Sequence, residues 1–127
     1  MKEINRKFQS LNDEKKKVLI VEDDDTLREL FSLLLERFQF EVVSASNGVE
    51  ALELYNDTID IVLTDIVMPL MGGIELIKEL QQQDPNLKCI AITGFSNVKV
   101  PPEIQVLHKP ITGLKLANSL KKKLAGA

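Results

Sequence analysis

Three acidic residues follow apolar runs in a pattern that suits cation binding and group transfer. Glu22 and Asp23 come directly after the apolar run at 18–21, and Asp65 closes another. Clustered carboxylates repel one another unless they are protonated or bind a cation. Oxygen ligands of this kind suit Mg²⁺, and a carboxylate can act as a nucleophile toward phosphorus. These residues therefore predict a site that binds Mg²⁺ and at which a carboxylate could accept a phosphoryl group.

A hydroxyl and an ammonium group complete the predicted site. Thr93 ends a further apolar run, and Lys109 follows the last one. Phosphoryl transfer depends mainly on positioning and on neutralising the phosphoryl oxygens. Lys109 can pair with one oxygen as a point charge, and Thr93 can donate a hydrogen bond to another. A single acid at a strand end is more often a turn or cap residue, which is how we interpret Asp24, Asp25 and Asp60.

The elements that must position these side chains are alternating strands and helices. Apolar runs predict strands over 18–21, 40–45, 59–64, 89–93 and 105–108. Helical spacing of apolar residues predicts helices over 27–38, 49–55, 74–80 and 114–124, with Asp25 and Thr112 as N-caps of the first and last. This alternation is typical of a parallel α/β sheet. Ligands bind beyond the carboxyl ends of such strands, so the candidate residues should share one rim.

The bulk composition is that of one globular domain. The chain has 127 residues, of which 44% are hydrophobic and 28% charged. We expect a tail or linker over 1–16, a domain over 17–124 and a short tail over 125–127. Within the first segment, Ile4, Phe8 and Leu11 have the spacing of a short amphipathic helix.

Charge and hydropathy argue against several classes of protein. The net charge is −3, with +3 carried by residues 1–17 and −6 by the remainder. A mildly acidic body is poorly suited to nucleic-acid binding, which needs a basic face. The sequence has neither an apolar run of ~18 residues, as a membrane span requires, nor a signal-peptide core. We therefore expect a cytoplasmic protein without direct nucleic-acid or membrane contact.

Five short motifs resemble the receiver (phospho-acceptor) domain of bacterial two-component response regulators. They are Val-Leu-Ile-Val-Glu-Asp-Asp at 18–24, Asn-Gly-Val-Glu-Ala-Leu at 47–52, Leu-Thr-Asp-Ile-Val-Met-Pro at 63–69, Ile-Thr-Gly at 92–94 and Lys-Pro at 109–110. The resemblance spans about residues 17–124. It implies a flavodoxin-like (CheY-like) three-layer α/β sandwich whose five-stranded parallel sheet has the order 2-1-3-4-5.

The resemblance also implies roles for individual residues. Asp65 would accept the phosphoryl group, assisted by Thr93 and Lys109. Mg²⁺ would be held by Glu22, Asp23, Asp65 and the backbone carbonyl of Val67. The donor would be a phosphohistidine on a sensor histidine kinase or histidine phosphotransfer protein, and output would pass to a downstream target protein or to an output domain outside this sequence. Such a domain is not an ordinary enzyme, because it catalyses only its own phosphorylation and dephosphorylation.

Two departures from the family concern a face of the domain away from the predicted site. Val106 stands where receivers usually carry an aromatic residue, and Pro101-Pro102 interrupts the stretch 95–104, where they usually carry their fourth helix. Proline removes a helical hydrogen bond and disfavours helix in the preceding residue. We expect this helix to be shortened or absent, and no dimer through that face. The resemblance further implies a cis bond between Lys109 and Pro110.

The resemblance also bears on the lifetime of the phosphorylated state. In receivers, the residues two positions after the acceptor and two after the threonine influence the water that hydrolyses the acyl phosphate. Here these residues are Val67 and Phe95. Neither side chain can orient a water by hydrogen bonding, so we expect slow self-dephosphorylation.

Two other functions remain as alternatives. A pseudo-receiver scaffold would bind partners without being phosphorylated, but its usual hallmark is loss of the acceptor, the acidic pair or the lysine, and all are present. A haloacid-dehalogenase-like phosphatase also uses a strand-end aspartate with Mg²⁺. Its pattern is Asp-x-Asp-x-Thr/Val; counted from Asp23, the fifth position is Leu27.

Overall fold

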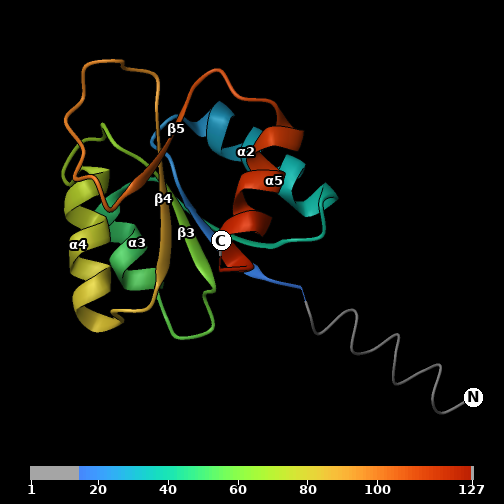
Figure 1. The fold of residues 1–127 in the computed structure, drawn as a ribbon, viewed down its shortest axis with the longest axis horizontal. Coiled ribbons are helices and arrows are strands. Elements are labelled where there is room, and N and C mark those ends of the chain that lie inside the picture. The colour runs from blue at the N-terminus through green and yellow to red at the C-terminus, as the bar shows by residue number, and fades with distance from the viewer. Residues whose placement is uncertain (1–14, 127) are drawn as a thin grey trace, which may run out of the picture.

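The computed structural model describes residues 15–126, which form a five-stranded sheet between two layers of helices (Figure 1). The elements are β1 (Lys17–Val21), α2 (Asp25–Arg37), β2 (Glu41–Ala45), α3 (Gly48–Leu54), β3 (Ile61–Asp65), α4 (Gly73–Gln83), β4 (Lys88–Thr93), β5 (Gln105–His108) and α5 (Gly113–Leu124). The amphipathic helix predicted from Ile4, Phe8 and Leu11 lies outside the described residues. Within them, no helix is long and apolar enough to cross a membrane.

The sheet has the order β2-β1-β3-β4-β5, and every strand pair is parallel. This confirms the predicted 2-1-3-4-5 order and the flavodoxin-like architecture. The register aligns Val21 with Thr64, Asp65 with Ile92 and Thr93 with His108. The carboxyl ends of the strands therefore meet at one edge, where the sequence placed the candidate site.

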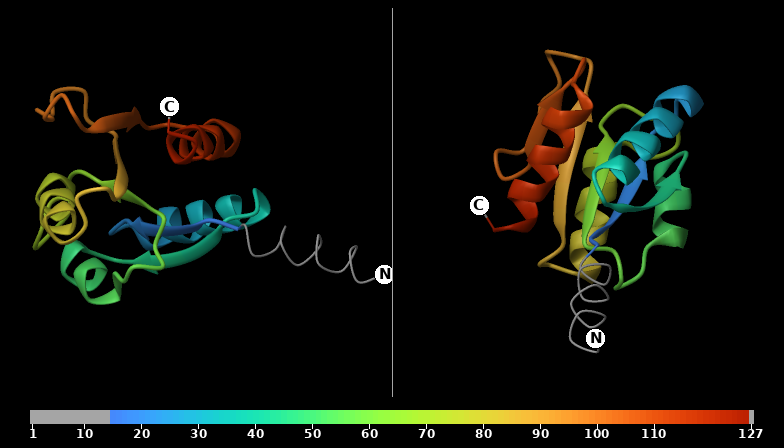
Figure 2. Two further views of the ribbon diagram at one scale, coloured as in Figure 1. Left: turned by 60° about the horizontal axis from the view of Figure 1, so that its bottom comes forward. Right: turned by 90° about the vertical axis from the view of Figure 1, so that its right-hand side faces the viewer.

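The apolar runs form strands because the central sheet is buried on both faces. Leu19 and Val21 belong to one apolar cluster, with the inner faces of α3 and α4. Val18 and Ile20 belong to a second, with α2 and α5. Successive strand residues point to opposite faces, and this separates the two layers seen in Figure 1 and, from the α2 and α5 side, in Figure 2. The two clusters thus pack against the central strands from both faces, beneath the strand ends that carry the candidate residues.

The helix starts follow capping chemistry, with one correction to our prediction. The N-cap of α2 is Asp24, whose Oδ1 accepts a hydrogen bond from the Leu27 N–H at 3.0 Å, whereas we had predicted Asp25. Asp25 is the first helical residue and pairs with Arg28 at 2.6 Å. Consecutive aspartates suit either the cap or the first turn, so sequence alone did not separate them. Thr112 caps α5 as predicted.

The connection from β4 to β5, residues 94–104, has no helix in this described part of the chain. This confirms the expected loss of the fourth family helix. Val98, Val100 and Ile104 instead pack against the apolar cluster beneath α3 and α4. After β5, the Lys109–Pro110 bond is cis, as the family resemblance implied. The sheet thus keeps its five strands although one crossover carries only a loop.

Candidate functional site

The three predicted carboxylates come together at the carboxyl edge of the sheet. Glu22 and Asp23 follow β1 and Asp65 ends β3, and one carboxylate oxygen from each lies within 4.8 Å of the others. Glu22 is only 2% exposed and Asp65 7%, whereas Asp23 is exposed. The Glu22 N–H donates to the Ala45 carbonyl at 3.1 Å, which extends the strand pairing into the site. Tertiary packing therefore builds the acidic cluster that the sequence indicated.

Lys109 enters this cluster from β5. Its Nζ lies 2.8 Å from Oε1 of Glu22 and 3.1 Å from Oδ2 of Asp65. Its backbone N–H donates to the Thr93 carbonyl at 2.8 Å, which fixes the start of the side chain beside β4. Lys109 thus bridges two buried carboxylates from different strands.

Thr93 and Val67 occupy the same edge. The Thr93 side chain is buried, and its Oγ1 accepts a hydrogen bond from the Phe95 N–H at 3.1 Å. Among the described residues the hydroxyl proton has no acceptor, so Thr93 can donate it to a bound group. Val67 lies two residues beyond Asp65 in the loop after β3, with its side chain exposed. We call Glu22, Asp23, Asp65, Thr93 and Lys109 the rim.

The rim has more negative than positive charge. Although Asp23 is exposed as a whole, partial desolvation of its carboxyl group raises its pKa above the ordinary value, and a hydrogen bond and charge repulsion involving Glu22 raise it further. Burial lowers the pKa of Lys109, but hydrogen bonds to Glu22 and Asp65 raise it more, so its net pKa is above the ordinary value. One ammonium thus faces three carboxylates. Such an oxygen-rich, negative site fits a hard divalent cation.

Two residues that shape the site were missed in the sequence. Arg28 donates from Nη1 to the Glu22 backbone carbonyl at 2.9 Å, and its only sequence signal is the i,i+3 spacing from Asp25. At Gly73, a Cβ would lie 2.0 Å from the Asp65 carbonyl oxygen. Gly73 is the second glycine of a Gly72-Gly73 pair at the start of α4. The close approach of α4 to the end of β3 requires the second glycine.

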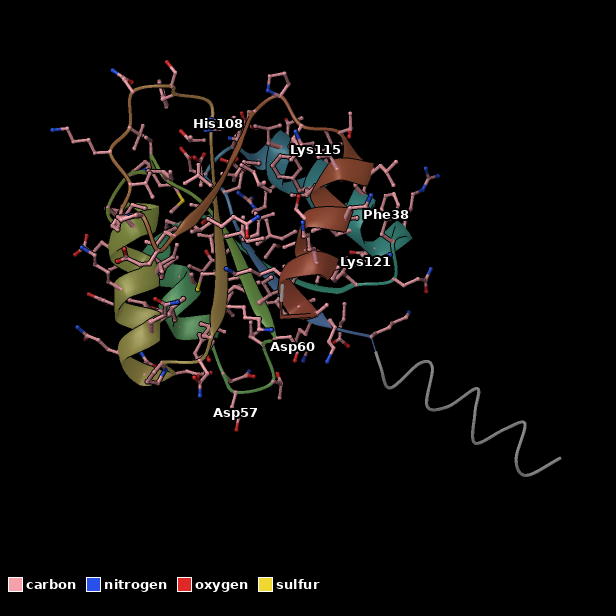
Figure 3. All side chains as sticks on the ribbon, in the orientation of Figure 1. Phe38, Asp57, Asp60, His108, Lys115 and Lys121 are labelled. Carbon is pink, nitrogen blue, oxygen red and sulfur yellow. The ribbon has the colours of Figure 1, made fainter. Side chains whose placement is uncertain are left out.

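The other polar residues near strand ends lie outside the acidic cluster. The Asp60 side chain accepts a hydrogen bond from the Lys17 N–H at 2.8 Å. Figure 3 shows Asp57 and Asp60 at the end of the sheet opposite His108, and so away from the rim. His108 itself is exposed and pairs in register with Thr93. These residues are distinct from the acidic cluster.

Sequence comparisons agree with this geometry. The model of the response regulator receiver domain family matches residues 18–121. The response regulator receiver protein CpdR of Brucella abortus (strain 2308) is 38% identical over 119 residues, which cover 88% of this chain and 99% of that protein. The sensor kinase CckA of the same strain is 34% identical over 116 residues, which cover 84% of this chain but 12% of the kinase.

Solved structures share the fold. A response regulator receiver domain protein from Clostridium thermocellum has a TM-score of 0.82 and 26% identity, covering 87% of this chain and 95% of that chain. The response regulator TrrA from Thermotoga maritima, solved in complex with Mg²⁺-BeF, has a TM-score of 0.76 and 29% identity, covering 84% and 97%. Since the family match runs from β1 into α5 and includes the whole rim, the chain belongs to the response regulator receiver domain family of two-component signalling.

Proposed function

We propose that this receiver domain accepts a phosphoryl group on Asp65 in a Mg²⁺-dependent reaction and switches conformation in response. The donor is a phosphohistidine on a sensor histidine kinase or histidine phosphotransfer protein. The observation that carries the proposal is the buried Asp65 carboxylate, paired with Lys109 at 3.1 Å and grouped with Glu22 and Asp23. The switched domain signals to a downstream target protein or output domain.

The chemistry needs one bond to form and one to break. A carboxylate oxygen of Asp65 attacks phosphorus, and the new O–P bond replaces the P–N bond to the donor imidazole. The electron pair of the P–N bond returns to the ring nitrogen. Lys109 supports this step by pairing with a phosphoryl oxygen, and Thr93 by donating its free hydroxyl proton to another. Both groups already lie at the rim beside Asp65.

The chain offers a set of oxygen ligands that fits Mg²⁺. Glu22, Asp23 and Asp65 would supply carboxylate oxygens, and Val67 its backbone carbonyl. The Mg²⁺ in the TrrA relative supports this assignment. When bound, Mg²⁺ would neutralise negative charge on the carboxylates and on the phosphoryl oxygens.

Phosphorylation can be tested with acetyl phosphate, Mg²⁺ and intact-mass measurement. We expect the wild-type chain to gain one phosphoryl group, and Asp65→Asn or a chelator to abolish the gain. Asp57→Asn is the matched control, because Asp57 is an exposed aspartate at the opposite end of the sheet. Undiminished labelling of Asp65→Asn would place the acceptor elsewhere. An unlabelled wild type would favour the pseudo-receiver scaffold.

The phosphatase alternative makes a different prediction. Steady turnover of a phosphate ester that is lost in Asp23→Asn but kept in Asp65→Asn would favour it. The local structure is against it, because Leu27 packs on the apolar cluster beneath α2 and α5 and has no hydroxyl to offer. Slow or absent turnover in all variants, together with labelling of Asp65, supports the receiver function.

A further inference from the structure

Arg28 lies in the first turns of α2 and reaches back to the end of β1. Side chains on a helix lean toward its N-terminus, so a long side chain at this position can cover the turn before the helix. Nη1 of Arg28 donates to the Glu22 backbone carbonyl at 2.9 Å, and Nη2 pairs with Oδ1 of Asp25 at 2.6 Å. The Arg28 side chain is only 21% exposed. The planar guanidinium therefore joins the strand end to the start of the helix.

The peptide unit between Glu22 and Asp23 is the piece of main chain that Arg28 holds. The Glu22 N–H donates to the Ala45 carbonyl at 3.1 Å, so the strand pairing fixes one side of Glu22. Within residues 15–126, Arg28 is the only hydrogen-bond donor to the Glu22 carbonyl on the other side. Because a peptide unit is planar, fixing this carbonyl also fixes the nitrogen and Cα of Asp23, from which the Asp23 carboxylate extends.

Asp23 depends on this support more than the other two carboxylates of the acidic cluster. Glu22 and Asp65 are buried, and each accepts a hydrogen bond from Lys109. Asp23 is exposed, so surrounding side chains restrain it less. Its main chain then decides whether its oxygen stays within 4.8 Å of the other two. Since Mg²⁺ demands near-octahedral geometry, a shift in the direction of this one ligand would lower the affinity.

We infer that Arg28 is a positioning residue for the metal site: by holding the Glu22 carbonyl, it directs the Asp23 carboxylate toward the other two and so strengthens Mg²⁺ binding. The inference rests on the proposed function and adds to it a residue whose hydrogen bonds go to the main chain and to Asp25. Groups that orient metal ligands commonly change metal affinity by about 10–100-fold.

The sign of the effect separates orientation from charge. A guanidinium near three carboxylates repels a second cation, so charge alone predicts that removing Arg28 tightens Mg²⁺ binding. Loss of orientation predicts the opposite, because the Asp23 carboxylate would no longer be held toward the site.

The direct test is calorimetric titration of Mg²⁺ into wild type, Arg28→Met and Arg28→Lys. We expect Arg28→Met to weaken Mg²⁺ binding about tenfold. Arg28→Lys should weaken it about threefold or less, because an ammonium can still donate to the Glu22 carbonyl. Arg37→Met is the matched control and should leave the affinity unchanged, since Arg37 is an exposed arginine at the other end of the same helix. Unchanged or tighter binding in Arg28→Met would overturn the inference.

An amide NMR spectrum recorded with chelator gives a second readout that needs neither metal nor phosphoryl group. We expect the Asp23 and Asp24 amide resonances to shift in Arg28→Met and to return toward their wild-type positions in Arg28→Lys. The Asp60 amide, at the opposite end of the sheet, should not move. Weaker Mg²⁺ binding with an unmoved Asp23 resonance, or with shifts spread over the whole domain, would give Arg28 a merely structural role and overturn the inference.

The outcomes separate this inference from the proposed function. If Arg28→Met binds Mg²⁺ as tightly as wild type while Asp65 is labelled in a Mg²⁺-dependent reaction, only the inference is overturned. Absence of Mg²⁺ binding in the wild type and in every variant would overturn the inference and the proposed metal dependence together.

Discussion

The rim and the segment 94–104 are neighbours that are built in opposite ways. The rim buries Glu22 and Asp65 and ties both carboxylates to Lys109 by contacts of 2.8 and 3.1 Å. The segment 94–104 crosses from β4 to β5 without a helix, and its second residue, Phe95, is 55% exposed. The contacts of the rim thus form at aligned strand ends without a helix in this crossover.

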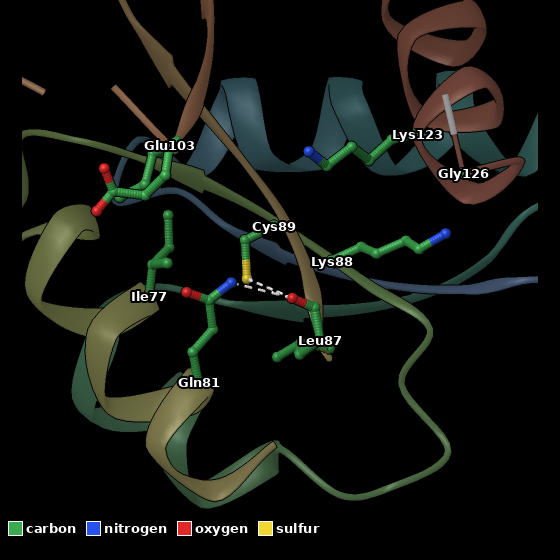
Figure 4. A pocket seen from close by; sticks show the side chains of 9 residues that line it. Ile77, Gln81, Leu87, Lys88, Cys89, Glu103, Lys123 and Gly126 are labelled. Carbon is green, nitrogen blue, oxygen red and sulfur yellow. Dashed lines mark hydrogen bonds between the residues drawn. The ribbon is translucent and has the colours of Figure 1, made fainter. Parts of the chain in front are cut away.

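The segment 94–104 also contributes to a cavity near the start of β4. Beside this strand lies a cavity of about 240 Å³, shown in Figure 4. It is lined by Ile77, Gln81, Leu87, Lys88, Cys89, Glu103, Ile104, Lys123 and Gly126. The Gln81 amide donates to the Leu87 carbonyl across its floor at 3.0 Å. Residues from the crossover and from three elements therefore cover this side only loosely.

The largest expected effect is a loss of stability when a methyl group is added next to the rim, compared with the same addition in segment 94–104. In Gly73→Ala, the new Cβ would meet the Asp65 carbonyl at 2.0 Å, so we expect a loss of about 1–3 kcal/mol in unfolding free energy. Gly94→Ala is the matched control in the crossover, where the nearest atom is Lys109 Cδ at 4.0 Å. It should change stability by less than about 0.5 kcal/mol. Urea unfolding measures the stability of both variants. Equal losses of unfolding free energy would contradict the expected difference between the two regions.

The lifetime of the acyl phosphate probes the boundary between the two regions. Val67→Asn combined with Phe95→Glu would add polar groups that can orient a water, so we expect decay about tenfold faster. The decay is followed by intact mass after removal of the phosphodonor. Leu70→Asn is the control, because Leu70 shares a loop with Val67 and is 81% exposed. An unchanged decay rate in the double variant would contradict the hypothesis that Val67 and Phe95 slow hydrolysis.

Alkaline pH tests the packing beneath the crossover. Burial raises the pKa of Cys89 to about 12 from its ordinary 9.0. A raised folded-state pKa favours the protonated thiol, so its stabilisation is full below pH 9 and is lost as the pH rises toward 12. Between neutral pH and pH ~10, the unfolding free energy of Cys89→Ala should therefore fall by about 1 kcal/mol less than that of wild type. Tyr55, whose pKa is also raised to about 12, keeps its own contribution in both proteins.

Rapid alkylation of the Cys89 thiol in the folded protein at neutral pH would contradict this. The thiolate is the reactive form, and the buried thiol should yield it only when the chain unfolds. Comparison of native and urea-unfolded samples by intact mass supplies the measurement.

The smallest expected effect is on association. The segment 94–104 is a loop, and Val106 replaces the usual aromatic residue. We therefore expect that phosphorylation does not cause the chain to dimerise through the face formed by this segment, β5 and α5. Sedimentation velocity before and after treatment with acetyl phosphate should give one unchanged species. A phosphorylation-dependent dimer that is lost on substituting Val106 would show that the loop replaces the helix fully.

The sequence alone determined the sheet and the membership of the rim. Uninterrupted apolar runs such as 18–21 can satisfy their burial only inside a parallel sheet covered on both faces. Their carboxyl ends then share an edge, so Glu22, Asp65 and Thr93 could be grouped without coordinates. The prolines at 101 and 102 likewise excluded a full helix in the crossover, because their effect is local and covalent.

Only the tertiary structure decided which rim groups touch. That Glu22 rather than the more exposed Asp23 holds Lys109 depends on burial and on side-chain reach across two strands, which no local pattern encodes. The need for glycine at position 73 also arises from α4 approaching β3, a contact between elements distant from any sequence signal. Local chemistry set the elements, and packing between them set the distances on which the charges act.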